Sequence, residues 1–150
     1  MKSFRVRPVS KIRGTVLVPG DKSISHRAAI LAAIADGPST LRNYLMSEDC
    51  LNTLNCLCEL GVTWEKRNDD VIVQGVGLHG LRAPTQDLYV GNSGTSIRLL
   101  LGLLAAQPFQ SCITGDASIC RRPMGRVIEP LRRMGAEIKA EANGEFAPLH

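Results

Sequence analysis

The chain has 150 residues, of which 44% are hydrophobic and 21% are charged, and its 18 Lys and Arg residues outnumber its 14 Asp and Glu residues. This hydrophobic content can form a packed core, and it excludes intrinsic disorder, which combines low hydrophobicity with high net charge. The longest apolar run, residues 28–35, is far shorter than the ~20 residues that a membrane-spanning helix needs.

The cysteines and the first residues of the chain indicate the cellular compartment. Five cysteines without a Cys-X-X-Cys motif predict neither a disulfide framework nor a zinc site, and they fit a reducing cytoplasm. Residues 1–7 are cationic, but no apolar segment of a signal peptide follows them. Basic runs with interleaved aromatic residues are also absent from the sequence, so we expect no nucleic-acid partner. The lack of a long apolar run predicts no membrane partner.

Strands and helices alternate in the first half of the chain. Residues 15–18 are a predicted strand because of their β-branched side chains. A helix is predicted to begin at Ser23 or Ser25, whose hydroxyls can cap it, and to end before Asp36-Gly37-Pro38. Residues 40–45 form a second predicted strand.

A second helix and a hairpin follow. Residues 47–49 combine a capping serine with two acids, which suit the first turn of a helix, and Gly61 suits its end. Residues 62–66 and 71–74 are predicted to pair around a turn at 68–70. The apolar face of the helix is expected to consist of Leu51, Leu54, Leu57 and Cys58.

The second half of the chain repeats this pattern. Residues 91–98 resemble residues 20–27, and both segments follow a β-rich run and precede an apolar stretch. The order strand, helix, strand, helix, strand, strand is therefore expected twice, at about residues 13–80 and 86–150. In the second copy, residues 88–90 are a predicted strand, the first helix is predicted to begin at Ser93 or Thr95, and the second helix to end at Gly135. The apolar face of that second helix is expected to consist of Val127, Ile128, Leu131 and Met134.

The last predicted element is a hairpin. Residues 136–141 lead to Asn143-Gly144, a strong turn signal, and the closing strand is predicted to begin near Glu145. Because the sequence stops at His150, a domain that ended there would leave an unpaired sheet edge. We therefore expect the chain to be the N-terminal part of a longer protein.

Both copies place Gly and Ser at a strand-to-helix turn, where backbone N–H groups and the helix dipole favour anions. Lys22 and Arg27 add full positive charges to the first copy, and Arg121, Arg122 and Arg126 gather before the fourth helix. A solvated basic surface explains each feature taken alone. Their combination in one chain favours binding of phosphate or carboxylate groups.

Three segments, in this order, resemble the signatures of the 5-enolpyruvylshikimate-3-phosphate synthase family: residues 18–28 (VPGDKSISHRA), 91–98 (GNSGTSIR) and 121–124 (RRPM). The resemblance extends over essentially the whole chain. It implies an α/β (α+β) fold of two similar domains, each built from three βαβαββ units around buried helices. Residues 1–12 would then be the first strand of the partner domain, and residues 13–150 an incomplete enolpyruvyl transferase domain.

The resemblance also implies a reaction. The family transfers the enolpyruvyl group of phosphoenolpyruvate to shikimate 3-phosphate, in the shikimate pathway, and releases phosphate. The acceptor hydroxyl attacks the enol carbon while the methylene carbon is protonated, and a tetrahedral intermediate then expels phosphate. No cofactor and no metal are implied. The expected partners are the two substrates, the remainder of the two-domain enzyme, and the inhibitor glyphosate, which imitates phosphoenolpyruvate.

Roles follow from the matched positions. The resemblance assigns shikimate 3-phosphate to Lys22, Ser23 and Arg27, and phosphoenolpyruvate to Lys22, Asn92, Gly94 and Arg122. Lys22 is the expected catalytic residue, because it would touch both substrates and serve in proton transfer. The family's acidic proton-transfer residues match no position here. Leu99 follows Arg98 where many plant and enteric members have Pro, so we expect weaker inhibition by glyphosate than in those members.

Two alternatives stay open. UDP-N-acetylglucosamine enolpyruvyl transferase shares the fold, but that family has Lys-Asn at the position of Lys22-Ser23 and lacks a counterpart of Arg27. It usually carries a reactive Cys where this chain has Ala117. The second alternative is a module that binds shikimate 3-phosphate without turnover, because enolpyruvyl transfer needs a site closed between two domains.

Overall fold

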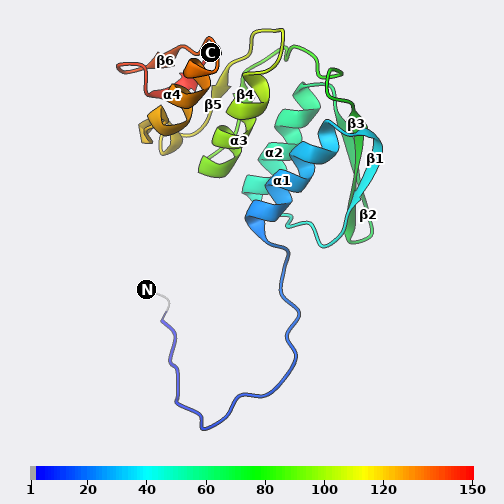
Figure 1. Ribbon diagram of the computed structural model, residues 1–150. Coiled ribbons are helices and arrows are strands. Elements are labelled where there is room, and N and C mark those ends of the chain that lie inside the picture. The colour runs from blue at the N-terminus through cyan, green and yellow to red at the C-terminus, as the bar shows by residue number, and fades with distance from the viewer. Residues whose placement is uncertain (1–2) are drawn as a thin grey trace.

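Three helices lie side by side in the middle of the molecule, with one small sheet on either side of them (Figure 1). The computed structural model describes residues 3–150. Helices α1 (Lys22–Ala33), α2 (Glu48–Glu59) and α3 (Gly94–Leu104) contact one another. Residues 3–20 extend from this body as a tail that contains neither helix nor strand.

The first sheet is antiparallel and has three strands in the order β1-β3-β2. Its strands are β1 (Asp36–Leu41), β2 (Thr63–Arg67) and β3 (Asp70–Val76). The tight β2–β3 turn contains Asn68 at φ +56°, a conformation that Asn tolerates better than most residues. This hairpin and the positive φ of Gly61, which follows α2, confirm the prediction for residues 61–74.

The second sheet has four strands in the order β4-β5-β7-β6, in which β4 and β5 are parallel and the other pairs are antiparallel. Its strands are β4 (Leu88–Tyr89), β5 (Ile113–Thr114), β6 (Ala140–Glu141) and β7 (Phe146–Leu149). The short helix η1 (Ile119–Arg121) and α4 (Gly125–Arg133) connect β5 to β6. Asn143 and Gly144 both have positive φ in the last turn, as the sequence predicts.

The two sheets correspond strand by strand except at one edge. Strand β4 pairs with the edge of β5, whereas no strand within residues 3–150 pairs with the corresponding edge of β1. The prediction of a strand at residues 15–18 is wrong for this structure. Val16, Leu17 and Val18 are 80%, 95% and 70% exposed. A strand needs a partner for its backbone hydrogen bonds, and the tail pairs with none of the described strands.

Local signals also fail at the first helix and at the strand that follows it. The N-cap of α1 is Asp21, whose side chain accepts from the Ile24 N–H at 2.7 Å, so the prediction of a serine cap is wrong. Ser25 instead donates to the Asp21 carbonyl at 2.8 Å. Strand β1 begins at Asp36 and not at residue 40, because pairing with β3 overrides the local preference of Gly37 and Pro38 for a turn.

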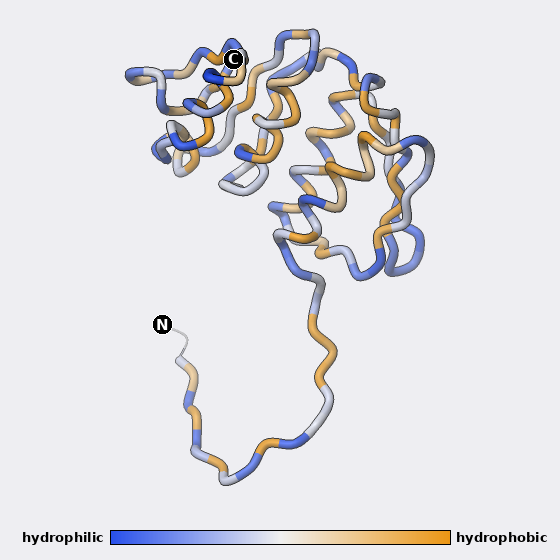
Figure 2. Tube along the Cα trace, viewed as in Figure 1, coloured by the Kyte–Doolittle hydropathy of each residue, from blue (hydrophilic) through white to orange (hydrophobic). Residues whose placement is uncertain are grey.

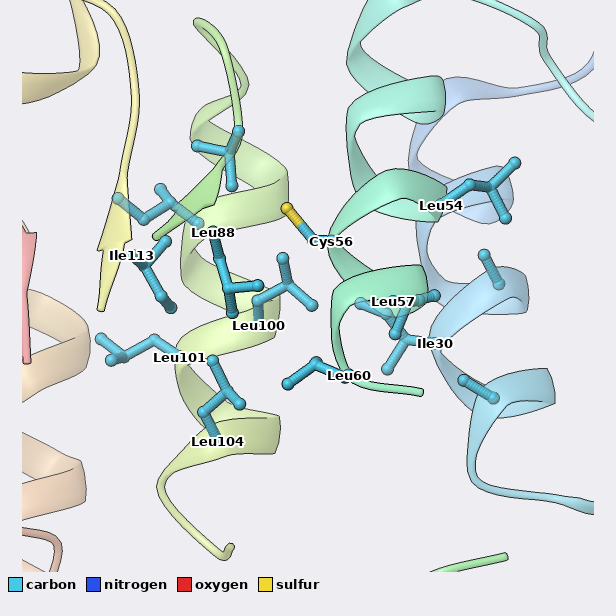
Figure 3. Close-up of a cluster of buried hydrophobic side chains, with 14 of the residues drawn as sticks. Ile30, Leu54, Cys56, Leu57, Leu60, Leu88, Leu100, Leu101, Leu104 and Ile113 are labelled. Carbon is cyan, nitrogen blue, oxygen red and sulfur yellow. The ribbon is translucent and has the colours of Figure 1, made fainter. Parts of the chain in front are cut away.

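Leucines of the central helices fill the core, where Leu60 lies beside Leu100 of α3 and Leu57 of α2 lies beside Ile30 of α1 (Figure 3). Leu54, Leu57 and Leu100 are fully buried there, while polar segments lie mainly on the outside (Figure 2). Cys58 is exposed although it was expected on the apolar face of α2, because the neighbouring Cys56 faces the core in its place. The helices are too short to carry a membrane-spanning stretch in the described part of the chain.

The prediction that Met134 belongs to the apolar face of α4 is also wrong. Met134 is 82% exposed, because it lies just beyond the last turn of α4, and only Ile128 of that helix is fully buried. The apolar face of α4 is therefore narrower than the sequence pattern predicts.

Truncation of Leu57 should destabilise the chain. We expect Leu57→Ala to lower the free energy of unfolding by about 2–5 kcal/mol, because it removes apolar contacts and leaves a cavity. The adjacent and exposed Cys58→Ala is the matched control, with an expected change within about 0.5 kcal/mol. Urea unfolding followed by circular dichroism measures both, and equal losses for the two variants would contradict the assignment of the helix face.

Candidate functional site

The candidate site lies where α1, α2 and α3 begin. Lys22 is the first residue of α1, and its Nζ donates to Asp49 Oδ2, in the first turn of α2, at 2.9 Å. This hydrogen bond and the charge of Asp49 raise the pKa of Lys22 above its ordinary value of 10.5, although the positive charge of Arg122 acts in the opposite direction. The ammonium group is therefore charged at neutral pH and half exposed, so it can bind an anion.

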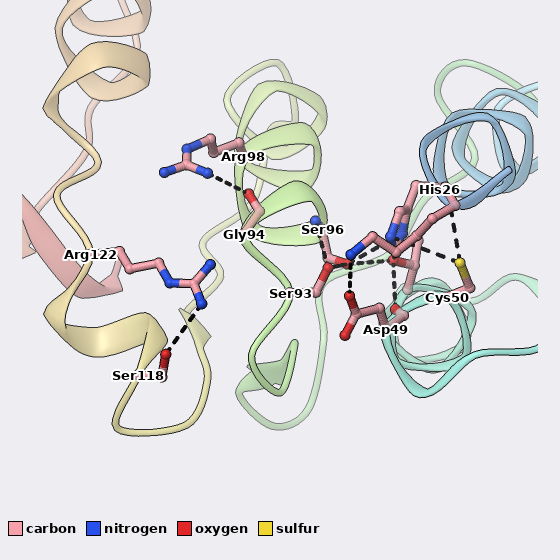
Figure 4. Close-up of polar contacts among 11 residues, drawn as sticks. His26, Asp49, Cys50, Ser93, Gly94, Ser96, Arg98, Ser118 and Arg122 are labelled. Carbon is pink, nitrogen blue, oxygen red and sulfur yellow. Dashed lines mark hydrogen bonds and ion pairs between the residues drawn. The ribbon is translucent and has the colours of Figure 1, made fainter. Parts of the chain in front are cut away.

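The start of α3 contains the second part of the site. Ser93 caps this helix by accepting from the Ser96 N–H at 3.2 Å. The Arg98 guanidinium folds back and donates to the Gly94 carbonyl at 3.0 Å, as Figure 4 shows. From the other side, Arg122 donates to Ser118 Oγ at 3.2 Å.

The two guanidinium groups converge on Gly94. A Cβ atom at this position would lie 2.9 Å from Arg98 Nη1 and 3.0 Å from Arg122 Nη1. Such short contacts force a neighbouring group to move, so glycine allows both cations to approach the first turn of α3. Two guanidinium groups beside the free N–H groups of a helix start suit an anion with several oxygens.

The structure brings together some of the predicted site residues. Lys22 lies on one side, and Gly94 with Arg122 lies on the other, on α3 and beyond η1. Ser23 is the second residue of α1, Arg27 lies one turn further along the same helix, and Asn92 immediately precedes the cap of α3. Within residues 3–150, however, no side-chain hydrogen bond or ion pair joins them to the rest of the site.

Two residues were missed as members of the site. Local sequence identifies Asp49 only as an acid that suits a helix dipole, because its ion pair with Lys22 is a contact between segments 27 residues apart in the sequence. The repeat identifies Arg98 only as the last residue of the motif. The four-residue spacing from Gly94 to Arg98 was a usable signal, since side chains at i+4 reach back along a helix.

A group of buried polar side chains lies beneath these residues. His26 Nδ1 is 2.8 Å from Thr53 Oγ1, and Thr53 Oγ1 is 2.7 Å from Ser96 Oγ. Ser96 Oγ donates to Ser93 Oγ at 2.7 Å. His26 is fully buried, and this burial lowers its pKa below the ordinary value of 6.5, although the charge of Asp49 acts in the opposite direction.

Among the described residues, neither a metal site nor the main cavity coincides with this group of charged residues. Within residues 3–150, no three His, Cys, Asp or Glu side chains gather in a way that could hold a metal ion. A cavity of about 480 Å³ lies between α4 and the β6–β7 hairpin and includes Arg126 and Arg132. Lys22 and Gly94 do not line this cavity, and the convergence of charges occurs at the helix starts.

The comparison with known families decides the identity of the chain. Residues 6–150 match the sequence model of the family described as EPSP synthase (3-phosphoshikimate 1-carboxyvinyltransferase). The chain belongs to the EPSP synthase family. The resemblance stated from the sequence signatures is thereby confirmed.

Individual members of the EPSP synthase family agree with this assignment. The chain is 52% identical over 146 residues to the 3-phosphoshikimate 1-carboxyvinyltransferase of Brevibacillus brevis, covering 97% of this chain and 34% of that protein. It is 53% identical over 141 residues to that of Geobacillus thermodenitrificans, covering 94% and 33%. A solved EPSP synthase from Acinetobacter baumannii superposes with a TM-score of 0.86 at 49% identity, covering 91% of this chain and 31% of that one. The chain thus spans about a third of the length of these relatives.

The buried His26 should make stability depend on pH. Because its pKa is lower in the folded chain than the ordinary 6.5, the unfolded chain binds a proton that the folded chain does not. Its contribution is therefore complete above about pH 6.5 and is lost as the pH falls below that value. Urea unfolding at several pH values should show a smaller loss on acidification for His26→Asn than for the wild type. The same loss in both would contradict the assignment.

Proposed function

We propose that this chain supplies part of an EPSP synthase that transfers the enolpyruvyl group of phosphoenolpyruvate to shikimate 3-phosphate, with release of phosphate, in the shikimate pathway. The convergence of Arg98 and Arg122 on Gly94, close to the charged Lys22, is the observation that carries the proposal. Both substrates are polyanions, and this site offers them three cations and the N–H groups of a helix start, together with the Asp49 carboxylate that is paired with Lys22. The family assignment supplies the reaction.

Each site residue receives a role under this proposal. Phosphoenolpyruvate binds at the start of α3 between Arg122, Asn92 and Gly94, where a guanidinium group can donate two parallel hydrogen bonds to one phosphate or carboxylate group. Arg98 adds charge from the same helix. Shikimate 3-phosphate binds along the first two turns of α1, at Ser23 and Arg27, with Lys22 between the two substrates.

Lys22 acts as a hydrogen-bond donor and acid. Its ion pair with Asp49 raises its pKa, which keeps the amine protonated at neutral pH. A protonated amine can stabilise negative charge on the phosphate groups and can donate a proton as the methylene carbon of phosphoenolpyruvate is protonated. It cannot accept the proton of the attacking hydroxyl while it remains charged, so a base must come from elsewhere in the enzyme.

The proposal extends to domain organisation. Residues 13–150 belong to an incomplete enolpyruvyl transferase domain with two repeat units, of which the first lacks its opening strand in this structure. Residues 1–12 are assigned to the first strand of the partner domain, although residues 1–2 lie outside the described part of the chain and residues 3–12 form no strand here. The exposed apolar side chains of the tail support this proposal. Phe4, Val6 and Ile12 are 98%, 88% and 88% exposed, and covering them with another domain would lower the free energy of the protein. The remainder of the two-domain enzyme is the partner, and the compartment is the cytoplasm.

The isolated 150-residue chain is proposed to be inactive. Its site must close between two domains, and this chain supplies residues from only one of them. It then behaves as a module that binds shikimate 3-phosphate without turnover. Calorimetric titration of the isolated chain with shikimate 3-phosphate, together with a phosphate-release assay, separates binding from turnover. Phosphate release by the isolated chain would refute the two-domain requirement.

The native protein at its full length provides the direct test of the reaction. It should release phosphate from phosphoenolpyruvate only when shikimate 3-phosphate is present, and glyphosate should compete with phosphoenolpyruvate. UDP-N-acetylglucosamine is the control acceptor, and release of phosphate with it instead would support the rival transferase. No release with either acceptor would refute enolpyruvyl transfer as the function.

Gly94→Ala should weaken phosphoenolpyruvate selectively. The added Cβ displaces the guanidinium groups of Arg98 and Arg122, and a lost charge-assisted hydrogen bond costs about 1.5–3 kcal/mol, or roughly tenfold and more in KM. The KM for shikimate 3-phosphate should change less. Gly102→Ala on the same helix is the matched control, because its Cβ would meet no atom within 4 Å. Steady-state kinetics of the full-length protein measure all four constants, and equal effects of the two variants would contradict the site.

A further inference from the structure

The buried polar side chains lie close behind the candidate site residues along the three helices. His26 and Thr53 lie four residues after Lys22 and Asp49, which are in the first turns of α1 and α2. Four residues correspond to about one turn and 6 Å along a helix. Ser96 is the third residue of α3, directly behind its cap Ser93. The three polar side chains therefore form a layer within about one turn of the site, with one member from each of α1, α2 and α3. We call this set the polar layer.

The contacts of the polar layer join all three helices. His26 Nδ1 lies 2.8 Å from Thr53 Oγ1 and 3.4 Å from Ser96 Oγ, so α1 is linked to both α2 and α3. Thr53 Oγ1 lies 2.7 Å from Ser96 Oγ, which links α2 to α3. Figure 4 shows His26 of α1 and Ser96 of α3 pointing toward each other. The layer continues through Ser96 to Ser93, the residue that caps α3 next to Gly94.

Burial makes these contacts restrictive. His26, Thr53 and Ser96 are all 0% exposed. A buried polar group that loses its partner pays the full cost of desolvation, so the helices cannot slide or rotate without breaking a costly set of hydrogen bonds. Further along the same helices the contacts are aliphatic, as with Leu57 and Leu100, and aliphatic contacts tolerate small shifts. The directional contacts are thus placed at the end of the bundle where the site lies.

The hydrogen-bond directions define His26 as a donor. Ser96 Oγ donates its single proton to Ser93 Oγ, so it must be the acceptor in its contact with Thr53 Oγ1. Thr53 Oγ1 then accepts from His26, which requires the proton on Nδ1. The other ring nitrogen, Nε2, faces Cys50 Sγ at 3.9 Å. In this arrangement His26 is the first donor of a chain that ends at the cap of α3.

We propose that His26 is a positioning residue for enolpyruvyl transfer, which holds the starts of α1 and α2 against the start of α3 through Thr53 and Ser96. It thereby fixes the separation of Lys22 from the turn that contains Gly94. This inference rests on the proposed function. His26 touches neither substrate; it acts one turn beneath the residues that do.

The test uses the native protein at its full length. His26→Leu fills the space without hydrogen bonds, whereas His26→Asn retains a carboxamide donor near the position of Nδ1. We expect His26→Leu to lower kcat/KM for phosphoenolpyruvate roughly 100-fold, since a misplacement of about 1 Å can cost that much, with most of the loss in kcat. His26→Asn should stay within about fivefold of the wild type. Urea unfolding of each variant verifies that it is folded.

Two further variants keep the test decisive if His26→Leu fails to fold. Thr53→Val removes the next member of the layer with little change in shape, and Ser96→Ala removes the third. Each should lower kcat/KM for phosphoenolpyruvate while the protein remains folded. Where His26→Leu folds, the double variant with Thr53→Val should lose much less than the product of the two single losses, because both changes break the same contact.

The outcomes separate this inference from the proposed function. Turnover by the wild type, together with near-normal kcat/KM in folded His26→Leu or in folded Thr53→Val and Ser96→Ala, would overturn the inference alone. The inference would also fall if His26→Asn lost as much activity as His26→Leu. Absence of turnover by the wild type would overturn the proposed function and this inference together.

Discussion

The packing of α3 against α1 and α2 is the constraint on which the rest of the structure depends. α3 opens the second repeat and contacts both helices of the first, so the two halves share one core. Ile97 and Leu100 of α3 are fully buried in that core, while Ser93 and Gly94 form its start. Because the apolar side chains of α3 are fixed in the core, the first turn of this helix is held near the start of α1, where Lys22 lies. A site for anions can therefore form between segments about 70 residues apart.

Local chemistry made much of this predictable. The cap at Ser93, the end of α2 at Gly61 and the turn at Asn143-Gly144 depend on neighbouring residues, and the sequence signals for them were sufficient. The strand expected at residues 15–18 and the start of β1 depend on which strand pairs with them, and residue preferences do not contain that information. For the site, the signatures indicated Lys22 and the Gly94 turn. The partners Asp49 and Arg98 depend on contacts and side-chain directions that only the folded chain defines.

Each of the three cations of the site donates a hydrogen bond to one protein acceptor, and a bound ligand can either replace that acceptor or bind beside it. Lys22 pairs with Asp49, Arg98 with the Gly94 carbonyl, and Arg122 with the Ser118 hydroxyl. These partners limit the freedom of long side chains, which reduces the entropy lost when an anion binds. A phosphate group at Lys22 must compete with the Asp49 carboxylate, so part of its binding energy is offset. In return, the ammonium group keeps both its charge and its direction.

The repeated motif ends in Arg in both copies, yet the two arginines differ in their surroundings. Arg98 is folded back onto the first turn of its own helix, whereas Arg27 is exposed in the second turn of α1. The repeat therefore preserves the strand-to-helix architecture while its charges are placed differently. Under the proposed function, this difference lets one architecture bind two different anions: a compact one at α3, where two guanidinium groups converge, and a larger phosphorylated ring at α1, where Arg27 can reach outward. The polar layer then matters because two similar sites become one reaction centre only if their separation is fixed.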